Sequence, residues 1–427
     1  MDKVMADEVV STSPADTRKK VILAGLVGNV MEWYDFAVYG FFASIIGVHF
    51  FPSENPAISL IAAFGAFAAG FLVRPLGGLL IGRIGDKIGR KRAMVISVMA
   101  MAVPTVLIGL MPTYQTIGMA APVLIVVLRI VQGLSVGGEY TSSLIFLAEH
   151  AKPGRRSRIS IWGMWGATAG TLLGSAIGAL ISDVLTADQL LNWGWRVPFL
   201  MGSLVAITGY LIRRSIHDTA PVGASKTPIQ DTFGKHKMPV IKLALVNVGF
   251  GVAFYAAFVY SVTYIKTIDK LPESIALNLN TLSMVILLAL LPASAWLSDR
   301  FGRKPLIVLG SALLTFGAIP IFHLLHTTDP VVIFLGELSF VIAIAIMAGG
   351  LVATNVELMP AAIRCTGLAF AYNASIGFFG GTTPMIVAWL IHTTGDPISP
   401  AYWVAAAGLI SLLTAVFLIP ETRDRTL

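Results

Sequence analysis

The chain has 427 residues, of which 56% are hydrophobic and only 12% are charged. A soluble domain carries roughly 25% charged residues, so much of this surface must face something other than water, and the mean hydropathy of +0.80 points to lipid. The single cysteine, Cys365, excludes an internal disulfide and argues against a metal cluster, while the net charge of +7 falls in short clusters between apolar stretches, a pattern typical of membrane orientation rather than of nucleic-acid binding.

Twelve apolar stretches of the chain are long enough to cross a lipid bilayer as helices. A helix needs about 20 apolar residues to span the hydrocarbon core, and glycine and proline are tolerated inside such helices because neighbouring helices pack against them. The sequence therefore predicts an all-α membrane protein with twelve transmembrane helices. The predicted spans cover approximately residues 21–48, 57–81, 93–111, 119–147, 158–183, 195–213, 239–266, 275–297, 305–326, 331–356, 365–393 and 401–419.

Lysine and arginine side chains fall mainly in alternate loops between these stretches. If the spans alternate in direction, 24 of the 30 lysines and arginines lie on one side of the membrane and only 3 on the other. Loops rich in lysine and arginine stay in the cytoplasm, so we expect both termini to be cytoplasmic in a bacterial inner (plasma) membrane. Residues 1–20 lack the layout of a signal peptide and are predicted to be a polar cytoplasmic tail.

The two halves of the chain repeat each other. The segment GRIGDKIGRK at 82–91 recurs as AWLSDRFGRK at 295–304, and a glutamate followed seven residues later by an arginine also occurs twice. The repeated residues are Asp86 with Asp299, Arg90 with Arg303, Glu149 with Glu357, and Arg156 with Arg364, at offsets of 213 and 208 residues. Parallel repeats of this kind predict two bundles of six helices. We expect an N-terminal bundle at 21–213, a central cytoplasmic loop at 214–238, a C-terminal bundle at 239–419 and a cytoplasmic tail at 420–427.

The loop at 82–91, with its second copy at 295–304, resembles the signature of the major facilitator superfamily. Further motifs resemble those of its metabolite:proton symporter family. They are GNVMEWYDF at 28–36, FLVRPLGG at 71–78, QGLSVGGEY at 132–140, and Asn373-x-Ser375 followed by FGGTTP at 379–384. The resemblance covers nearly the whole chain. It implies a monomeric carrier of a small solute, with the proton as coupling ion and no cofactor.

Members of that family carry α-ketoglutarate, citrate and other dicarboxylates, shikimate, or proline and betaine. The segments at 137–141 and 373–403 are most similar to the proline/betaine branch. Two features differ from that branch: Arg129 stands where we expect lysine, and the chain ends at Leu427 without the long coiled-coil tail of the osmosensing members. We therefore expect a carboxylate-bearing metabolite, either an organic acid or a zwitterion such as proline or betaine, and no dedicated osmosensor.

Two carboxyl groups, Glu32 and Asp35, lie one helical turn apart on one face of the first predicted span. A charged group at the centre of a span costs at least about 2.5–3.5 kcal/mol, so each needs a reason to be there. A buried carboxyl can bind and release a proton near neutral pH, and no histidine lies near the middle of a predicted span. We expect at least one of the pair to carry the coupling proton; the alternative is that one of them braces a neighbouring helix.

A polar stripe at helical spacing follows the fourth predicted span and consists of Arg129, Gln132, Glu139 and Ser143. The planar guanidinium of Arg129 can bind a carboxylate through two hydrogen bonds. We expect Arg129 and Gln132 to contact the substrate and Glu139 to be a third candidate for proton coupling. Alternatively, Arg129 pairs with a first-span carboxylate and controls its protonation, or forms a structural ion pair with Glu139.

Further candidates for the substrate site are Arg74, Tyr255 and Asn373. Arg74 precedes Pro75 toward the cytoplasmic end of the second span, which suits either the floor of a pocket or a gate. Ring faces such as that of Tyr255 attract quaternary ammonium groups, but helix packing is the favoured explanation for the aromatic set as a whole. That set comprises Tyr255, Tyr260, Tyr264, Trp162 and Trp165. Glu337 occupies the repeat-equivalent position of Arg129, and its place near the outer surface argues against a role in a central cavity.

Opposite charges occur together in both repeated loops, Asp86 with Arg90 and Asp299 with Arg303. Anchoring by the positive-inside rule explains the arginines but not the aspartates. In the family that the sequence resembles, these loops form charge pairs that close the cytoplasmic side and break when it opens. We therefore expect the four residues to form an inner gate.

The sequence as a whole predicts a proton-coupled secondary transporter that works by alternating access. The glycines from Gly133 to Gly138 lack the strand–helix junction and the Gly-Lys-Thr of a phosphate loop, and no nucleotide-binding domain is recognisable, which excludes the usual kind of ATP-driven pump. No metal-ligand cluster and no nucleophile–base spacing suggests an enzyme, and no nucleic-acid partner is expected. The alternative on the same fold is an uncoupled facilitator or exchanger, or a membrane sensor.

Overall fold

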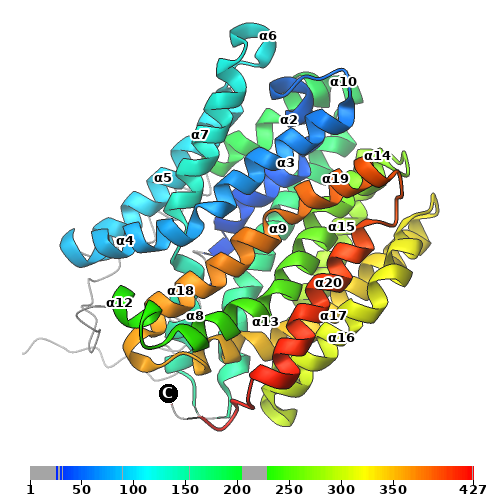
Figure 1. Cartoon of the computed structure of the whole chain (residues 1–427). Helices are drawn as coiled ribbons and strands as arrows, with labels where there is room; N and C mark the ends of the chain where they lie inside the picture. The colour runs from blue at the N-terminus through cyan, green and yellow to red at the C-terminus, as the bar shows by residue number, and fades with distance from the viewer. Residues whose placement is uncertain are drawn as a thin grey trace, which may run out of the picture.

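Every regular element in the part of the chain that the structure describes is a helix (Figure 1). The computed structural model describes residues 26, 29–30, 32–88, 90–152, 154–203, 228–425 and 427, with the backbone alone at 82–88, 90–95, 98, 139 and 228. The predicted all-α fold class is confirmed.

The helices of the first repeat are residues 32–41, α2 (Ala43–Phe50), α3 (Pro56–Leu72), α4 (Arg74–Ile88), α5 (Arg90–Leu110), α6 (Tyr114–Ile117), α7 (Ala120–Ser135), α8 (Glu139–Glu149), α9 (Arg156–Val184), α10 (Ala187–Gln189), η1 (Leu190–Gly194) and residues 196–203. Those of the second repeat are α12 (Pro228–Phe233), α13 (Lys237–Tyr255), η2 (Ala256–Tyr260), α14 (Ser261–Thr267), α15 (Glu273–Phe301), α16 (Arg303–Leu325), α17 (Pro330–Glu357), η3 (Ala361–Ile363), α18 (Arg364–Ser375), η4 (Ile376–Gly380), α19 (Thr383–Thr394), α20 (Pro400–Leu413) and η5 (Thr414–Leu418). Helix α12 lies within the stretch predicted to be the central loop.

Nine helical stretches among the described residues are long and apolar enough to cross a membrane. They coincide with nine of the twelve predicted spans and are Pro56–Ile81, Ala120–Glu149, Arg156–Val184, Lys237–Thr267, Glu273–Phe301, Arg303–Leu325, Pro330–Glu357, Ala361–Thr394 and Pro400–Leu418. Of the other three predicted spans, 21–48 and 195–213 include positions outside the description, whereas 93–111 coincides with α5, which is described in part by its backbone alone.

Local sequence fixes where several of these helices begin. Asn55 precedes α3, and its side-chain oxygen accepts a hydrogen bond from Ala57 N at 3.0 Å. Asp329 precedes α17 and accepts from Val331 N at 2.9 Å. Both helices have proline at their first position, where the missing N–H costs nothing because no acceptor lies within the helix.

Glycines allow α7 to pack unusually closely against α3 and α4. A Cβ atom added to Gly133 would lie 1.8 Å from the carbonyl oxygen of Gly70, and one added to Gly137 would lie 2.0 Å from the nitrogen of Gly78. Small residues at such crossings let helix backbones approach each other. This packing brings Arg129 on α7 toward Arg74 at the start of α4.

Gly133→Ala should therefore destabilise the first repeat. The added methyl group has to displace backbone rather than a side chain, so the cost should be at least the ~1–3 kcal/mol typical of an overpacked core. Thermal unfolding of the detergent-solubilised protein would measure it. Gly65→Ala on α3 is the matched control, because its Cβ would lie 3.7 Å from Met385 Sδ, an ordinary contact. Equal unfolding temperatures for the two variants would contradict this account.

Helices of the two repeats pack against each other along the middle of the molecule, with α15 beside α9, α19 beside α3 and α18 beside α4. In Figure 1, α4, α5 and α7 lie on one side and α16, α17 and α20 on the other. Helices α6, α10 and α14 lie toward one end, and α12 and the C-terminus lie at the other, which is the end predicted to be cytoplasmic.

Candidate functional site

Four charged side chains are buried close together within the first repeat. Glu32 and Asp35 lie on the helix at 32–41, Arg74 is the first residue of α4, and Arg129 lies on α7. The exposed fractions of these whole residues are 3%, 6%, 2% and 0%, respectively. We call these four residues the charged site. Its two carboxyl and two guanidinium groups have opposite charges, which offsets part of the cost of burying each of them in a membrane-spanning bundle.

Arg74 binds Glu32 directly. Its Nη2 donates a hydrogen bond to Oε1 of Glu32. The guanidinium carbon also lies 4.8 Å from the ring centroids of both Phe36 and Phe71, so the cation faces two aromatic rings. The structure places Arg74 in the charged site, where it pairs with Glu32, and the choice between a pocket floor and a gate stays a prediction.

Asp35 and Arg129 are connected through two neutral side chains. Arg129 Nη1 donates to Gln132 Oε1 at 2.9 Å, and Gln132 Nε2 donates to Thr105 Oγ1 at 2.7 Å. Thr105 Oγ1 lies 2.9 Å from both Asp35 Oδ2 and Met101 O. Its single hydrogen can therefore serve the ionised Asp35 or turn to the carbonyl when Asp35 is protonated. A continuous chain of hydrogen bonds thus runs from Asp35 through Thr105 and Gln132 to Arg129.

Arg129 is surrounded by aromatic rings and keeps donors available. Its guanidinium carbon lies 4.6 Å from the ring centroid of Phe36, 4.5 Å from that of Tyr39 and 5.2 Å from that of Phe67. Among the described residues, none accepts a hydrogen bond from its Nε or Nη2. Buried polar groups are rarely left without a partner. A guanidinium with two adjacent donors suits a bidentate carboxylate.

Aromatic residues of both repeats meet next to the charged site. The ring of Trp33 lies 6.1 Å from that of Tyr140, 5.8 Å from that of Phe254 and 6.4 Å from that of Tyr255, between centroids. Tyr140 in turn lies 4.8 Å from Tyr372 of α18. We call Trp33, Tyr140, Tyr255 and Tyr372 the aromatic cluster. Neither Trp33 Nε1 nor the Tyr255 hydroxyl bonds to a partner within the described part of the chain.

The structure places the other aromatic candidates away from this cluster. The Tyr264 hydroxyl donates to Pro397 O at 3.0 Å, and Trp162 packs on Trp165 with ring centroids 5.8 Å apart. Tyr260 packs on Phe64 at 5.9 Å. These contacts fit the helix-packing interpretation, whereas Tyr255 lies in the aromatic cluster beside Trp33.

The polar stripe predicted along the fourth span is interrupted. Helix α7 ends at Ser135 and α8 begins at Glu139, so Arg129 and Gln132 lie on a different helix from Glu139 and Ser143. The predicted stripe is therefore divided between two helices, and Gly137, which lies between them, packs closely against Gly78 of α4. The side chain of Glu139 lies outside the description, so its predicted coupling role stays a prediction.

Asn373 supports this interruption from the other repeat. Its Nδ2 donates to Gly137 O at 2.5 Å and to Ala369 O at 2.9 Å. A helix break frees carbonyl groups that need a donor inside the membrane, and Asn373 supplies one. The side chain expected to bind substrate thus bonds to backbone across the boundary between the repeats.

Asp299 connects the repeats at the predicted cytoplasmic end. Its two carboxylate oxygens accept from Ser157 N at 3.2 Å and Arg158 N at 3.1 Å, which are free N–H groups at the start of α9. Arg303 Nη1 also donates to Asp299 Oδ1 at 2.7 Å. An anion at a helix N-terminus is favoured by the helix dipole. The pairing expected for Asp299 and Arg303 is present; the side chains of Asp86 and Arg90 lie outside the description.

The repeated Glu and Arg residues pair across the two repeats. Arg156 Nη1 lies 3.3 Å from Glu357 Oε1, and Arg364 Nη1 lies 2.8 Å from Glu149 Oε1. Arg303 Nη2 also contacts Glu357 Oε1 at 3.3 Å. Together with the Asp299 contacts, these pairs form what we call the inner ion-pair network.

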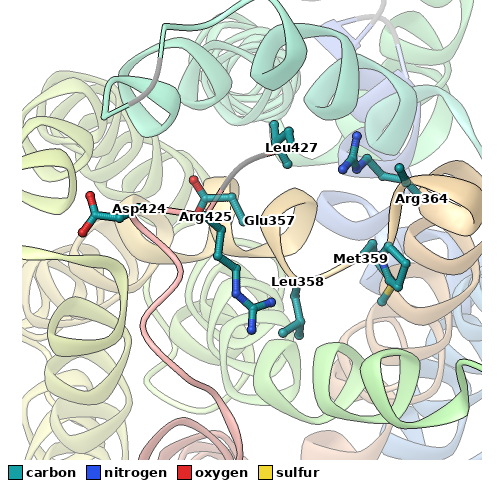
Figure 2. Close-up of a pocket in the computed structure, with 9 residues that line it drawn as sticks. Glu357, Leu358, Met359, Arg364, Asp424, Arg425 and Leu427 are labelled. Carbon is teal, nitrogen blue, oxygen red and sulfur yellow. The ribbon is translucent and has the colours of Figure 1, made fainter.

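The C-terminal segment adds to this network, and nothing in the sequence analysis pointed to it. Thr422 Oγ1 donates to Glu357 Oε2 at 2.7 Å, and Arg425 O accepts from Arg156 Nη1 at 2.5 Å. A pocket of about 480 Å³ opens beside these contacts (Figure 2). Its lining comprises Glu357, Leu358, Met359, Pro360, Ala361, Arg364, Asp424, Arg425 and Leu427.

Comparison with known proteins shows similarity over nearly the whole chain. The family profile of the Major Facilitator Superfamily matches residues 25–382. A proline/betaine transporter of Salmonella typhimurium is 34% identical over 425 residues, covering 96% of this chain and 85% of the relative. The glycine betaine/proline/ectoine/pipecolic acid transporter OusA of Dickeya dadantii is 35% identical over 425 residues, covering 96% of this chain and 84% of the relative.

Solved structures share the fold at lower sequence identity. The proton:xylose symporter XylE bound to 6-bromo-6-deoxy-D-glucose superposes with a TM-score of 0.76 at 20% identity, covering 97% of this chain and 98% of that one. A partially occluded inward-open conformation of the xylose transporter XylE from E. coli gives a TM-score of 0.75 at 20% identity, covering 96% and 99%. At this identity the match establishes the arrangement of helices and nothing about the solute.

Proposed function

Because the chain belongs to the major facilitator superfamily and is a multi-pass membrane transporter rather than an enzyme, we propose that it is a proton-coupled symporter of a zwitterion of the proline/betaine type. The observation that carries this proposal is the charged site, in which Arg129 has available donors next to an aromatic cluster built from both repeats. The protein works as a monomer in a bacterial inner membrane, with both termini in the cytoplasm, no cofactor and the proton as coupling ion.

A zwitterion of this type has one carboxylate and one positively charged nitrogen. The carboxylate fits Nε and Nη2 of Arg129, since an arginine fork matches two carboxylate oxygens. The nitrogen, especially a quaternary one, fits the ring faces of the aromatic cluster. The relatives named above as transporters of proline, betaine, ectoine and pipecolic acid favour this class over the organic acids that the sequence had left open.

Binding at Arg129 offers a mechanism for coupling. A substrate carboxylate at Arg129 takes over the positive charge that favours the ionised form of Asp35, so that proton binding to Asp35 becomes easier. By linkage, a proton on Asp35 must then strengthen substrate binding by the same factor. Glu32 is a poorer proton carrier, because Arg74 already neutralises it directly.

Uptake by proteoliposomes tests the proposal. We expect labelled proline or betaine to accumulate against its gradient when the outside is acidic, and to exchange without accumulation when the pH is equal on both sides. An uncoupled facilitator would exchange the substrate but ignore the pH gradient, and a sensor would bind it without exchange. Uptake of citrate, α-ketoglutarate or shikimate in place of the zwitterions would contradict the substrate class.

Alternating access requires the inner ion-pair network to break when the cytoplasmic side opens. Asp299→Asn should favour the inward-open state, because the amide keeps the shape but loses the charge that holds α9 and Arg303. Hydrogen bonds to charged groups contribute ~1.5–3 kcal/mol, so the ratio of open to closed molecules should rise about tenfold or more.

Distances between spin labels would measure this shift. Exposed positions Lys152 and Ala362 lie on the cytoplasmic end of the two repeats and accept labels in a Cys365→Ser background. The exposed Asp188→Asn at the other end is the matched control. If Asp299→Asn and the control give the same distance distribution, Asp299 does not hold the gate.

A further inference from the structure

A second buried carboxyl lies in the other repeat, far in sequence from the charged site. Glu337 on α17 is only 1% exposed. Ser283 Oγ on α15 donates to its Oε2 at 2.6 Å, and Ser261 at the start of α14 lies beside the same carboxyl. No described group donates to its Oε1.

No basic group of the described residues pairs with Glu337. Nearby charged side chains on the neighbouring elements have partners elsewhere: Lys266 contacts Glu273 at 2.6 Å, and His326 contacts Asp269 at 2.7 Å. His323, near the end of α16, is exposed. An ionised carboxylate buried without a cation carries a large desolvation cost, and such groups take up a proton instead.

The hydrogen bonds around Glu337 serve only one of its two carboxyl oxygens. Ser283 Oγ donates to Oε2, whereas Ser261 Oγ donates to Ala257 O at 2.6 Å. Among the described residues, nothing bonds to Oε1. An ionised carboxylate can accept several hydrogen bonds on its two oxygens, so a buried carboxyl group with a single donor suits the neutral, protonated form better.

The helix that carries Ser283 also contacts the first repeat. One turn away on α15, Asn280 Nδ2 lies 3.2 Å from Ser175 Oγ of α9 and 3.3 Å from Phe258 O, and Thr281 Oγ1 lies 2.8 Å from the same Ser175 oxygen. Phe258 belongs to η2, a π-helical turn of the kind often found at functional sites. Asn280 and Thr281 contact the first repeat from the same helix that carries Ser283, so separation of the repeats on this side acts directly on the helix that carries the hydrogen-bond donor of Glu337.

We propose that Glu337, with Ser283 as its hydrogen-bond partner, is a second proton-binding site that is occupied in this conformation and exchanges its proton when α15 and α9 separate. The proposal rests on the proposed function for its role in transport, but proton occupancy can be measured separately. According to this proposal, the protein carries one proton at Asp35 and a second at Glu337 with each substrate molecule.

Infrared titration of the protein in lipid tests occupancy directly. In an Asp35→Asn background, which removes the other proposed proton carrier, the protein should show a protonated-carboxyl C=O band that persists at a pH where exposed acids are ionised, and Glu337→Gln should remove this band. Ser283→Ala, which deletes the hydrogen-bond donor to Oε2, should shift the titration of that band to higher pH. The exposed Glu54→Gln is the control and should leave the band unchanged. If the band survives in Glu337→Gln, the proposal is wrong.

Proton and substrate fluxes, followed together in proteoliposomes, test the coupling. Glu337→Gln should carry one proton fewer per substrate than the wild type while substrate counterflow continues, and Glu54→Gln should match the wild type. An unchanged ratio in Glu337→Gln would overturn the second site. No proton flux in the wild type would instead overturn the proposed symport, and the infrared experiment would still decide whether Glu337 binds a proton.

Discussion

Asp35→Asn should lose one coupled proton while it continues to exchange substrate. Asparagine resembles a protonated aspartate in shape, and its carbonyl oxygen can accept from Thr105 as Asp35 Oδ2 does at 2.9 Å. It cannot release a proton. The variant should therefore stay in the state that binds substrate at Arg129, and counterflow should persist.

The expected size of the effect follows from the proton gradient. One unit of pH difference is worth about 1.4 kcal/mol per proton, or a tenfold concentration ratio. With the membrane potential clamped at zero, Asp35→Asn should accumulate substrate about tenfold less than the wild type for each unit of imposed gradient. Radiolabelled uptake at several gradients measures this slope.

Thr105→Val provides a matched comparison at the same place. Valine keeps the shape of threonine but removes the hydroxyl that links Asp35 to Gln132. The proton should still bind, so accumulation should persist, but its pH dependence should shift because Asp35 loses a donor. If Asp35→Asn accumulates substrate as well as the wild type at every gradient, Asp35 is not a coupling residue.

The sequence predicted the components of the charged site better than their connections. An ionisable residue inside an apolar span is conspicuous, so Glu32, Asp35 and Arg129 could be identified from hydropathy alone. Thr105 could not, because a single threonine in an apolar helix is ordinary and only the structure shows that it lies between Asp35 and Gln132. The sequence pattern shows that a charged side chain lies in an apolar span, whereas the group that pairs with it depends on how the helices pack.

The internal repeat in the sequence identified some of the residues of the inner ion-pair network. Glu149, Arg156, Glu357 and Arg364 were recognisable as repeated residues, but each pairs with a residue of the other repeat, which sequence offset cannot reveal. The interruption of the fourth span was missed for a different reason. Glycine pairs are tolerated in continuous membrane helices, and the close packing of Gly137 against Gly78 of α4 is visible only in the structure.

Arg74 and Glu32 should show a large coupling free energy in the stability of the folded protein. Both side chains are 3% exposed, so Glu32→Gln leaves a buried guanidinium without its counter-charge. Breaking such a pair from one side costs about 3–5 kcal/mol, whereas replacing both partners is often close to neutral. Glu32→Gln and Arg74→Gln should each lower the unfolding temperature markedly, and the double variant should recover most of the loss.

A double-mutant cycle on the detergent-solubilised protein gives the coupling free energy. Transport by the double variant then separates stability from function. If Arg74 and Glu32 act only as a neutral pair beside the coupling residue, the stable double variant should still respond to a pH gradient through Asp35. If the double variant exchanges substrate but ignores the pH gradient, Glu32 rather than Asp35 carries that proton. The reason is that the replaced residues are not part of the hydrogen-bond chain that connects Asp35 with Thr105, Gln132 and Arg129, so this chain stays intact.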